Sequence, residues 1–557
     1  MRKRKYLPII LTIALAAAGC KKYVDKGLVD QFDDSNFWIS EDNVRMYSWP
    51  FYEIFKGYGN GNGSGDFYFT TLNDDQASPA ISVLTTVVPT TSGKWDFTLI
   101  RKANVLLERI NKVPMPDDAK NHWRGVARFF RAYAYFNLVK DYGDVPWVGR
   151  AADISDTAYV YKSRDPRAAV MDSVLADLDF ACANVRVKDQ ENTVNQYVAL
   201  ALKSRICLFE GTWREYHKEA KLPDAAKFLL AAKDASEKLI NGPFALNANY
   251  TTTYNSLDLT GNKEVMLYKR YVPGYLGHSL IGYLTSSTTM SGLNKSAIDA
   301  FVCSDGLPIK LSPLYQGDNN IKATRMNRDN RLLLSIDTVL CYPTNLVSGR
   351  TSTTGYRPTK FLNPQVANVV APFNDTDAPL FWLAEVLLNY AEAAAVLDKL
   401  GQYTFTQTDL DKSINKLRTR AGIPALQTSG GGQTAVNGVS FSDPANTTSV
   451  SSLIWEIRRE RRVELMLDGF RYYDLMRWSL GDNLTTTTNP DITKGAKVPP
   501  PPAGSKDLTV DENGYISVYN AGISRVFDKN KNYLEPIPSG QISLYPGGNL
   551  EQNPGWK

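Results

Sequence analysis

The stretch RRERRVELMLDGFRYYDLMRW, residues 458–478, concentrates side chains that could do chemistry. It holds six arginines, four carboxylates and four aromatic residues. Unpaired arginines at this density are typical of a phosphate-binding surface, as on proteins that bind nucleic acid. Two glutamates on one helix, Glu460 and Glu464, could instead be the acid and base of a glycosidase. A third interpretation is a structural cluster in which the charges neutralise one another.

The spacing of the charges favours the structural interpretation. Opposite charges three residues apart are neighbours on a helix. The stretch and the residues just before it contain four such pairs: Glu456 with Arg459, Arg461 with Glu464, Asp468 with Arg471, and Asp474 with Arg477. A nearby guanidinium also lowers a carboxylate pKa and so removes the proton that a glycosidase acid must donate. Gly469 is predicted to cap the first helix, and a second short helix to run to Trp478. We therefore predict a partly buried clamp with five principal members: Glu460, Arg461, Glu464, Arg471 and Asp474.

Composition excludes several other kinds of site. The chain has 63 basic and 58 acidic residues, and this even balance is not that of a nucleic-acid-binding protein. Its three histidines, His122, His217 and His278, lie far apart in the sequence, which argues against a histidine metal site or a histidine-based triad. Asp74 and Asp75 in LNDDQAS could help to bind calcium or could form a solvated turn. No cofactor is expected.

The first twenty residues form an export signal. Residues 2–5 are basic, residues 6–18 are apolar and too short to span a bilayer, and Ala17-Ala18-Gly19 leads into Cys20. This ending resembles a bacterial lipobox, although Ala17 stands where leucine is usual. It implies cleavage before Cys20, acylation of the thiol and attachment to a membrane through the lipid. The alternative is a plain secretory signal that happens to contain a cysteine.

The remaining chain is predicted to be mainly helical. Periodic apolar residues predict helices at 95–114, 121–141, 165–185, 195–216, 223–240, 378–401 and 409–424, and a strand at 264–272. The helices pair at spacings near 35–40 residues, as in tetratricopeptide hairpins, and such stacked hairpins are a scaffold rather than a catalytic fold. Residues 243–375 read as irregular loops, and the glycine-rich stretch at 56–67 is predicted to be a loop without a phosphate site. A disulfide between Cys182 and Cys207 is left open.

Seven ordered blocks of sequence resemble the SusD/RagB family of nutrient-binding outer-membrane lipoproteins. The blocks are RRERRVELMLDGFRYYDLMRW, LIRKANVLLERI, WRGVARFFRAYAYFNLVKDYGDVPWV, LALKSRICLFEGTW, APLFWLAEVLLNYAEAA, INKLRTRAGIP and YLEPIPSGQISLYPGGNLEQNPGW. The resemblance implies a mainly α fold, a tetratricopeptide-like scaffold of helical hairpins with an inserted, loop-rich lobe. The expected organisation is a signal peptide at 1–19, a lipidated tether at 20–30 and one domain at 31–557, with scaffold at about 95–242 and 378–478, ligand lobe at about 243–377 and a C-terminal segment at 479–557.

The same resemblance implies a function without catalysis. Such proteins cover a SusC-like TonB-dependent outer-membrane transporter and deliver oligosaccharides to it, or peptides in RagB-like relatives. It also implies an outer-membrane location with the body facing the cell exterior. Lys21 and Lys22, directly after the anchor, form no acidic surface-export tag, so this orientation is predicted from the resemblance alone. A pure scaffold and a glycoside-processing enzyme stay open as alternatives.

Five residues are predicted to bind the ligand. Sugar rings stack on aromatic side chains, and their hydroxyls bond to amides and carboxylates. By their position at the start of the first long helix and after the predicted strand, the candidates are Trp95, Asp96, Tyr271, Tyr275 and Tyr283. The alternative for each aromatic residue is packing in the core or at the transporter interface.

Overall fold

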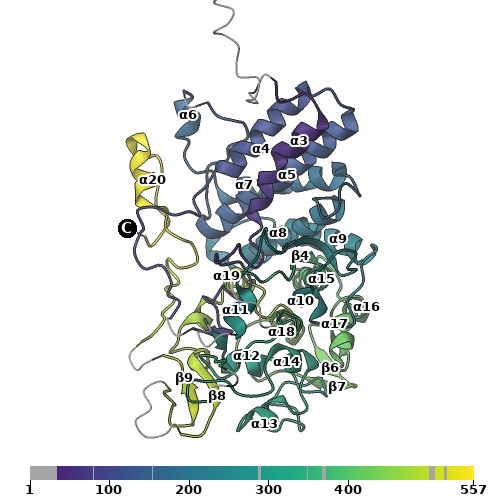
Figure 1. The fold of residues 1–557 in the computed structure, drawn as a ribbon, viewed down its shortest axis with the longest axis vertical. Coiled ribbons are helices and arrows are strands. Elements are labelled where there is room, and N and C mark those ends of the chain that lie inside the picture. The colour runs from purple at the N-terminus through teal and green to yellow at the C-terminus, as the bar shows by residue number, and fades with distance from the viewer. Residues whose placement is uncertain are drawn as a thin grey trace, which may run out of the picture.

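The computed structural model describes residues 34–556 except 35, 79–80, 154, 286–289, 346, 348, 367–371, 501–507 and 520–522. The predicted signal peptide, Cys20 and the tether lie outside the described residues. Figure 1 shows long helices in the upper part of the molecule and shorter helices and strands, joined by loops, in the lower part. The fold is mainly α, as predicted.

Long helices built from the first half of the chain form the scaffold. Local signals mark where they begin and end: Pro116 and Gly143 flank α5, Pro166 precedes α7, and the Asn195 side chain accepts the Val198 N–H at the start of α8. The helices are α3 (Glu41–Ser48), α4 (Thr98–Arg109), α5 (Asp117–Tyr142), α6 (Thr157–Val160), α7 (Arg167–Asn184), α8 (Gln196–Tyr216) and α9 (Ala225–Ile240). The predictions for α4, α5, α7, α8 and α9 are confirmed to within a few residues, whereas the short helices α3 and α6 were not predicted.

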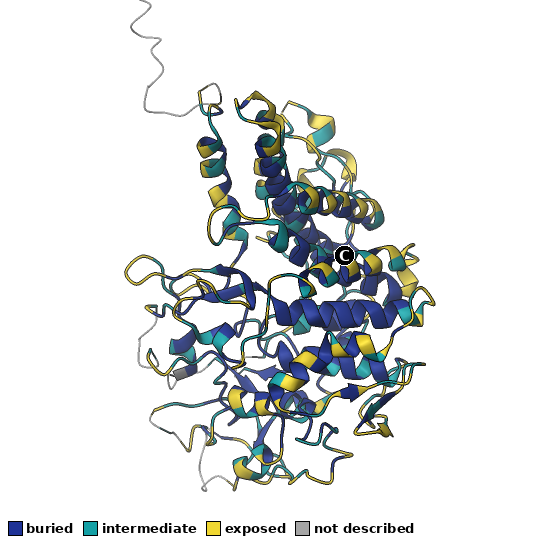
Figure 2. Cartoon of the chain, turned by 90° about the vertical axis from the view of Figure 1, so that its right-hand side faces the viewer, coloured by how far each residue is buried: buried dark blue, intermediate teal, exposed yellow. Residues whose placement is uncertain are grey.

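Small residues let neighbouring helices approach closely. A Cβ atom on Gly125 of α5 would lie 2.6 Å from Val185 Cγ2, just beyond α7. A Cβ atom on Gly211 of α8 would lie 2.7 Å from Leu229 Cγ on α9. The Ser204 and Ser236 hydroxyls, 2.7 Å apart and both buried, join α8 to α9. Figure 2 shows that buried residues, drawn dark blue, fill the long helices in the interior of the molecule. The helices therefore pair as hairpins.

The predicted helix at 378–401 begins with a strand. β4 (Ala378–Trp382) pairs antiparallel with β2 (Val265–Lys269), and α15 (Leu383–Lys399) follows without a gap. Phe381 and Trp382 are buried in this pairing. A short apolar run fits a buried strand and a buried helix equally well, so periodicity alone gave the wrong assignment for these five residues.

Two further helix predictions are wrong in their boundaries. The predicted helix at 409–424 is divided into α16 (Gln407–Asp411) and α17 (Ile414–Ala421), because Asp409 closes a capping box with Thr406 and the chain turns at Ser413. The helix of the charged stretch, α18 (Ser452–Glu464), ends before Gly469. Leu467 and Gly469 both have positive φ in the connection to α19 (Arg471–Arg477).

The loop-rich part of the molecule contains short elements and small sheets. The strand orders are β1-β3, β2-β4, β5-β6-β7 and β8-β9. The remaining elements are α10 (Thr252–Asn255), α11 (Leu280–Thr285), α12 (Lys295–Ala300), α13 (Ile321–Arg325), α14 (Asn330–Ser335), α20 (Ser539–Leu544), β1 (Gln76–Ala77), β3 (Gly292–Leu293), β5 (Leu426–Gln427), β6 (Thr434–Val436), β7 (Val439–Phe441), β8 (Lys494–Lys497) and β9 (Tyr515–Ser517).

One hydrophobic core extends from the first helices to the C-terminal segment. At its centre Trp382 lies near Phe67 and Tyr254, with ring centroids 6.3 and 6.1 Å away. Cys182 and Cys207 are free thiols, so the disulfide left open by the sequence is not formed. Among the described residues, no helix combines the length and apolar character needed to cross a membrane.

Candidate ligand-binding site

The charged stretch is a buried structural cluster, although only half of its predicted pairs form. Arg459 Nε lies 3.0 Å from Glu456, and Arg477 Nε lies 2.9 Å from Asp474, as predicted. Arg461 instead binds Asp474 on α19, with Nε 2.8 Å from the carboxylate. The spacing of residues along the sequence identifies neighbours on one helix only. A residue from another element can lie closer and form the ion pair instead.

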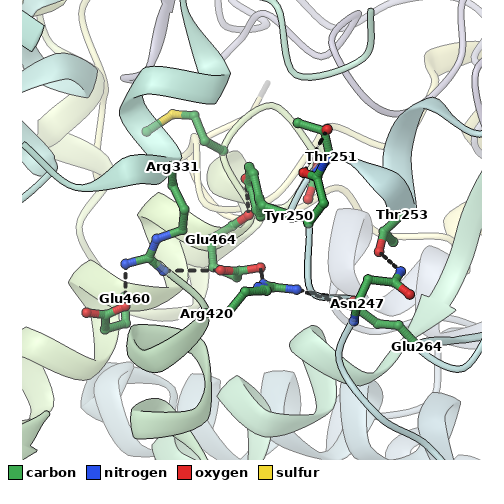
Figure 3. A network of polar contacts seen from close by, with 12 residues as sticks. Asn247, Tyr250, Thr251, Thr253, Glu264, Arg331, Arg420, Glu460 and Glu464 are labelled. Carbon is green, nitrogen blue, oxygen red and sulfur yellow. Dashed lines mark hydrogen bonds and ion pairs between the residues drawn. The ribbon is translucent and has the colours of Figure 1, made fainter. Parts of the chain in front are cut away.

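Glu464 takes its partners from other elements, as Figure 3 shows. Its carboxylate accepts hydrogen bonds from Arg331 of α14 and Arg420 of α17. Arg331 also reaches Glu460 at 2.9 Å, and Arg420 reaches Glu264, just before β2, at 3.1 Å. This buried network therefore ties α14, α17, α18 and the start of β2 together. The predicted Arg461–Glu464 pair is wrong.

The predicted Asp468–Arg471 pair is also wrong, because the connection at 465–470 is not helical. Arg471 binds Asp74 through two hydrogen bonds of 2.6 and 2.8 Å. Asp468 binds Lys360, with the charged atoms 2.7 Å apart and both side chains buried. The predicted clamp is thus a set of long-range ion pairs.

Asp74 and Asp75 form neither a calcium site nor a solvated turn. Both are buried, and Arg462 Nε lies 2.7 Å from Asp75. Burial alone would raise the pKa of Asp74, but the charges of Arg471 and Arg462 hold it at about 2. Across the described part of the chain, no group of three or more histidine, cysteine or acidic side chains is placed to hold a metal ion.

Arg458 is held by aromatic rings and not by a carboxylate. Its guanidinium lies between the rings of Tyr216 and Trp478, 4.6 and 4.5 Å from their centroids. Its Nε and Nη2 have no hydrogen-bond partner among the described residues. Cation–π contacts stabilise this buried charge in place of an ion pair.

The predicted ligand-binding residues differ widely in exposure. Trp95 is 9% exposed and packs edge-on against Tyr142, with centroids 4.9 Å apart. Tyr271 is 2% exposed and donates its hydroxyl to the Gly59 carbonyl at 2.7 Å. Both rings are therefore packed in the core, which is the alternative given above for each aromatic residue, and a ligand contact by either one stays a prediction.

The other three candidates reach solvent. Asp96 is exposed and accepts the Thr98 N–H at 2.9 Å, just before α4. Tyr283 is half-buried and packs edge-on against Phe69, with centroids 5.6 Å apart. Tyr275 is 92% exposed, which makes it the candidate with the most accessible ring.

The segment that carries Tyr275 pairs with a segment that carries a second exposed aromatic residue, Phe373, which the sequence analysis missed. Phe373 is 70% exposed, and its neighbour Asn374 forms two backbone hydrogen bonds with His278, of 2.8 and 3.1 Å. Tyr275 itself lies in a tight turn closed by Val272 and Leu276. We call the surface made by Val272, Tyr275 and Phe373 the aromatic platform. A Phe in the polar loop PFNDTD was the available sequence signal.

The glycine-rich loop at residues 57–65 packs against the two segments that carry the platform. The Gly61 N–H donates to the Gly277 carbonyl at 2.7 Å, and a Cβ atom on Gly61 would lie 4.0 Å from Pro372, beside Phe373. A Cβ atom on Gly65 would lie only 2.1 Å from the Gly57 carbonyl oxygen. Glycine is therefore required where the loop folds onto itself. The sequence predicted the loop correctly but not this role.

A buried carboxylate fixes the turn that carries Tyr275. Asp377 accepts the backbone N–H groups of Tyr271 and Leu259 at 2.9 and 3.0 Å. Burial raises the pKa of Asp377 to about 6, against the two hydrogen bonds that favour its charged form. These hydrogen bonds anchor the chain at Tyr271, directly before the turn. An anchored turn suits a surface that must keep an aromatic side chain in place.

The geometry defines a helical scaffold that presents aromatic side chains on a loop-borne platform. Two family models match the chain: the SusD family at residues 286–556, and a family described as starch-binding associating with outer membrane at residues 57–208. The chain belongs to the SusD/RagB family.

Individual relatives span nearly the whole chain. A SusD-like protein P38 from Formosa agariphila is 24% identical, over 86% of this chain and 92% of its own length. A SusD-like protein from Bacteroides ovatus is 22% identical, over 86% of this chain and 82% of its own. The crystal structure of a SusD-like carbohydrate-binding protein from Bacteroides fragilis superposes with a TM-score of 0.71 at 21% identity, covering 92% of this chain and all of that one. At this identity the structural likeness establishes the fold.

Proposed function

We propose that this protein is a non-catalytic glycan-binding lipoprotein of the outer membrane, which captures an oligosaccharide and passes it to a SusC-like TonB-dependent transporter. The observation that carries the proposal is the aromatic platform, on which Tyr275 and Phe373 are 92% and 70% exposed. Exposed rings of this kind stack on the apolar faces of sugars.

The comparisons support the class of ligand. One matching family is described as starch-binding, and the relative from Bacteroides fragilis as carbohydrate-binding. A further fold neighbour is described as a laminarin-binding SusD-like protein, with a TM-score of 0.54 at 18% identity. In our proposal the domain of residues 31–557 uses its helices as a scaffold, and the lobe at about 243–377 presents the platform to the ligand.

Calorimetry with a panel of oligosaccharides tests the proposal. Tyr275→Ala and Phe373→Ala should each weaken binding by up to about tenfold, because one stacked ring contributes roughly 1 kcal/mol. The melting temperature should stay unchanged, since both side chains are exposed. Leu544→Ala, which removes an exposed apolar side chain from α20, is the matched control and should bind normally.

A Trp95 variant tests the fold and not the binding of a ligand. Trp95→Ala should lower the melting temperature, because the ring is packed against Tyr142 and Phe97. Its effect on binding would therefore follow from damage to the fold and could not identify a ligand contact.

Two assays separate the proposal from its alternatives. Affinity purification from membranes should recover a large barrel partner, and incubation with oligosaccharides should release no new reducing ends. Turnover of a saccharide without a barrel partner would favour a glycoside-processing enzyme. Binding of peptides but not of saccharides would favour a RagB-like peptide carrier, and a barrel partner without any small ligand would favour a pure scaffold.

A further inference from the structure

A cavity of about 340 Å³ lies where three helices of the scaffold meet. It is lined by the C-terminal end of α8, the N-terminal end of α9 and the residues just after α15, and these three helices pack against one another (Figure 1). Its charged lining residues are Arg214, Glu215, Lys218, Lys221 and Asp224. A cavity of this volume is large enough for a small ligand. None of the residues of the aromatic platform lines it.

Arg214 has one hydrogen-bond donor left over. Its guanidinium donates through Nε to Glu210 Oε1 and through Nη1 to the Pro223 carbonyl oxygen, both at 2.7 Å. Its Nη2 has no hydrogen-bond partner among the described residues, although Arg214 is only 3% exposed. A buried donor without an acceptor is unfavourable. An acceptor atom that a ligand brings into the cavity would satisfy this donor.

The start of α9 adds backbone donors beside Arg214. Pro223, whose carbonyl Arg214 binds, is followed by Asp224, and α9 begins at the next residue. The Arg214 guanidinium also lies 4.3 Å from the ring centroid of Phe228, in the first turn of α9. The first N–H groups of a helix have no partners within it and attract anions, and the Asp224 side chain does not cap them. Backbone and guanidinium donors therefore border the cavity together.

Two carboxylates at the cavity are each shared by two cations. The ion pairs are those of Arg167 and Arg214 with Glu210, at 2.7 Å each, and those of Lys218 and Lys399 with Glu215, at 2.8 and 3.1 Å. Positive charges therefore outnumber negative charges by two in these groups. Lys221 and Asp224 are both exposed and of opposite charge, so they leave this excess unchanged. An anion with two negative charges would neutralise it.

We propose that this cavity, which we call the scaffold pocket, binds a phosphate monoester. The phosphate group would accept hydrogen bonds from Arg214 Nη2, from the first N–H groups of α9 and from the ammonium groups of Lys218 and Lys221. A phosphate monoester carries close to two negative charges at neutral pH and has three acceptor oxygens, which suits both the excess charge and the set of donors.

The inference goes beyond the proposed function, because the aromatic platform contributes nothing to the scaffold pocket. A soluble sugar phosphate and the headgroup of a phospholipid both carry the required group. The shared chemistry is the phosphate monoester, and the test separates the two sources.

Calorimetry with the full-length protein tests the inference. Glucose phosphate should bind at least about tenfold more tightly than glucose or glucuronate, which corresponds to one charge-assisted hydrogen bond. Binding of glucose phosphate alone would assign the scaffold pocket to a soluble ligand. Equal or tighter binding of dihexanoyl phosphatidic acid, a short-chain phospholipid, would assign it to a lipid headgroup. Tyr275→Ala should leave the binding of either phosphate unchanged.

Three variants locate the binding in the scaffold pocket. Lys221→Met should weaken the binding of the phosphate about fivefold, because an exposed charge contributes up to about 1 kcal/mol. Lys227→Met is the matched control and should bind normally, since Lys227 lies outside the cavity and pairs with Asp172 at 2.9 Å. Ala226→Asp should abolish binding by repelling the phosphate, while its melting temperature is unchanged or higher, because a carboxylate stabilises the N-terminus of a helix.

The inference would be overturned if glucose and glucose phosphate bound equally well, or if neither phosphate bound. Equal weakening by Lys221→Met and Lys227→Met would show that only the overall charge matters and would also overturn it, as would binding that survives Ala226→Asp. If Ala226→Asp does not fold, the pair of lysine variants at exposed positions still decides the result. Each of these outcomes leaves the binding of oligosaccharides to the platform untouched, so the proposed function stands or falls separately.

Discussion

At the scale of single residues, Glu464 is a buried carboxylate of the clamp. It forms ion pairs with the guanidinium groups of both Arg331 and Arg420. We predict that Glu464→Ala lowers the free energy of unfolding by roughly 3–5 kcal/mol, because removing one partner leaves buried charges uncompensated. Chemical denaturation measures this loss.

The control for Glu464→Ala is Glu53→Ala. Glu53 is exposed and forms no ion pair with a described residue, so its removal should change the unfolding free energy by less than about 0.5 kcal/mol. Any Glu464→Ala protein that folds should still bind its ligand. Normal stability combined with lost binding would contradict the structural role and point to a site in the charged stretch.

Glu392 gives the protein an acid-sensitive ion pair. Burial alone would raise its pKa, but Arg477, at 2.6 Å, holds the pKa at about 2, below the ordinary 4.5. A lowered pKa in the folded state stabilises the protein above pH 4.5, and this stabilisation is lost as the pH falls toward 2. The pair should contribute on the order of 3 kcal/mol to the pH dependence.

Glu392→Gln should therefore flatten the decline of the unfolding free energy between pH 4.5 and pH 2. Urea denaturation at a series of pH values measures the slope. Glu512→Gln, at an exposed position, should leave the slope as it is in the wild type. Equal slopes in the wild type and Glu392→Gln would show that other carboxylates control acid unfolding.

At the scale of elements, the contact between α8 and α9 depends on Gly211. A Cβ atom at this position would lie 2.7 Å from Leu229 Cγ and 3.0 Å from the Leu229 backbone nitrogen. Gly211→Ala should lower the unfolding free energy by about 1–3 kcal/mol, since the backbone atom cannot move aside as a side chain can. Thermal and chemical denaturation both report the change.

Gly93→Ala is the matched control for the α8–α9 contact. A Cβ atom on Gly93 would meet no atom within 4 Å, and its φ is not positive. This variant should be neutral or slightly more stable, because alanine restricts the unfolded chain. Equal destabilisation by both substitutions would mean that the two helices are packed less closely than Gly211 indicates.

At the scale of the whole molecule, we expect the location of the protein to depend on Cys20. The charged and apolar run that ends in Gly19-Cys20 predicts acylation, and no helix in the described ranges could cross a membrane. Cys20→Ala should move the protein from the membrane fraction to the soluble fraction. Metabolic labelling with a radioactive fatty acid checks the modification directly. A Cys20→Ala protein that stays membrane-bound and labelled would show that the anchor lies elsewhere.

At the candidate site, the sequence predicted the glycine-rich loop and one of the two aromatic residues of the platform. The sequence predicted a loop at 56–67 and proposed Tyr275 as a ligand contact, and the structure gives Tyr275 92% exposure. It missed Phe373 and proposed Trp95 and Tyr271, which are buried. An aromatic residue in a loop has no periodic pattern, so sequence alone cannot tell a packed ring from an exposed one.

The sequence by itself determined the features that depend on near neighbours along the chain. Apolar periodicity and flanking Pro or Gly residues place α5, α7 and α8, because a helix is specified by contacts three and four residues apart. The Glu456–Arg459 and Asp474–Arg477 pairs follow from the same rule. The family blocks and the mainly α fold could also be recognised from the sequence.

Only the tertiary structure decided which distant groups meet. Arg471 binds Asp74, 397 residues earlier in the chain, and Arg461 binds Asn389, 72 residues earlier. A buried charge takes the partner that the packing of the whole core brings to it, and local spacing does not encode that packing.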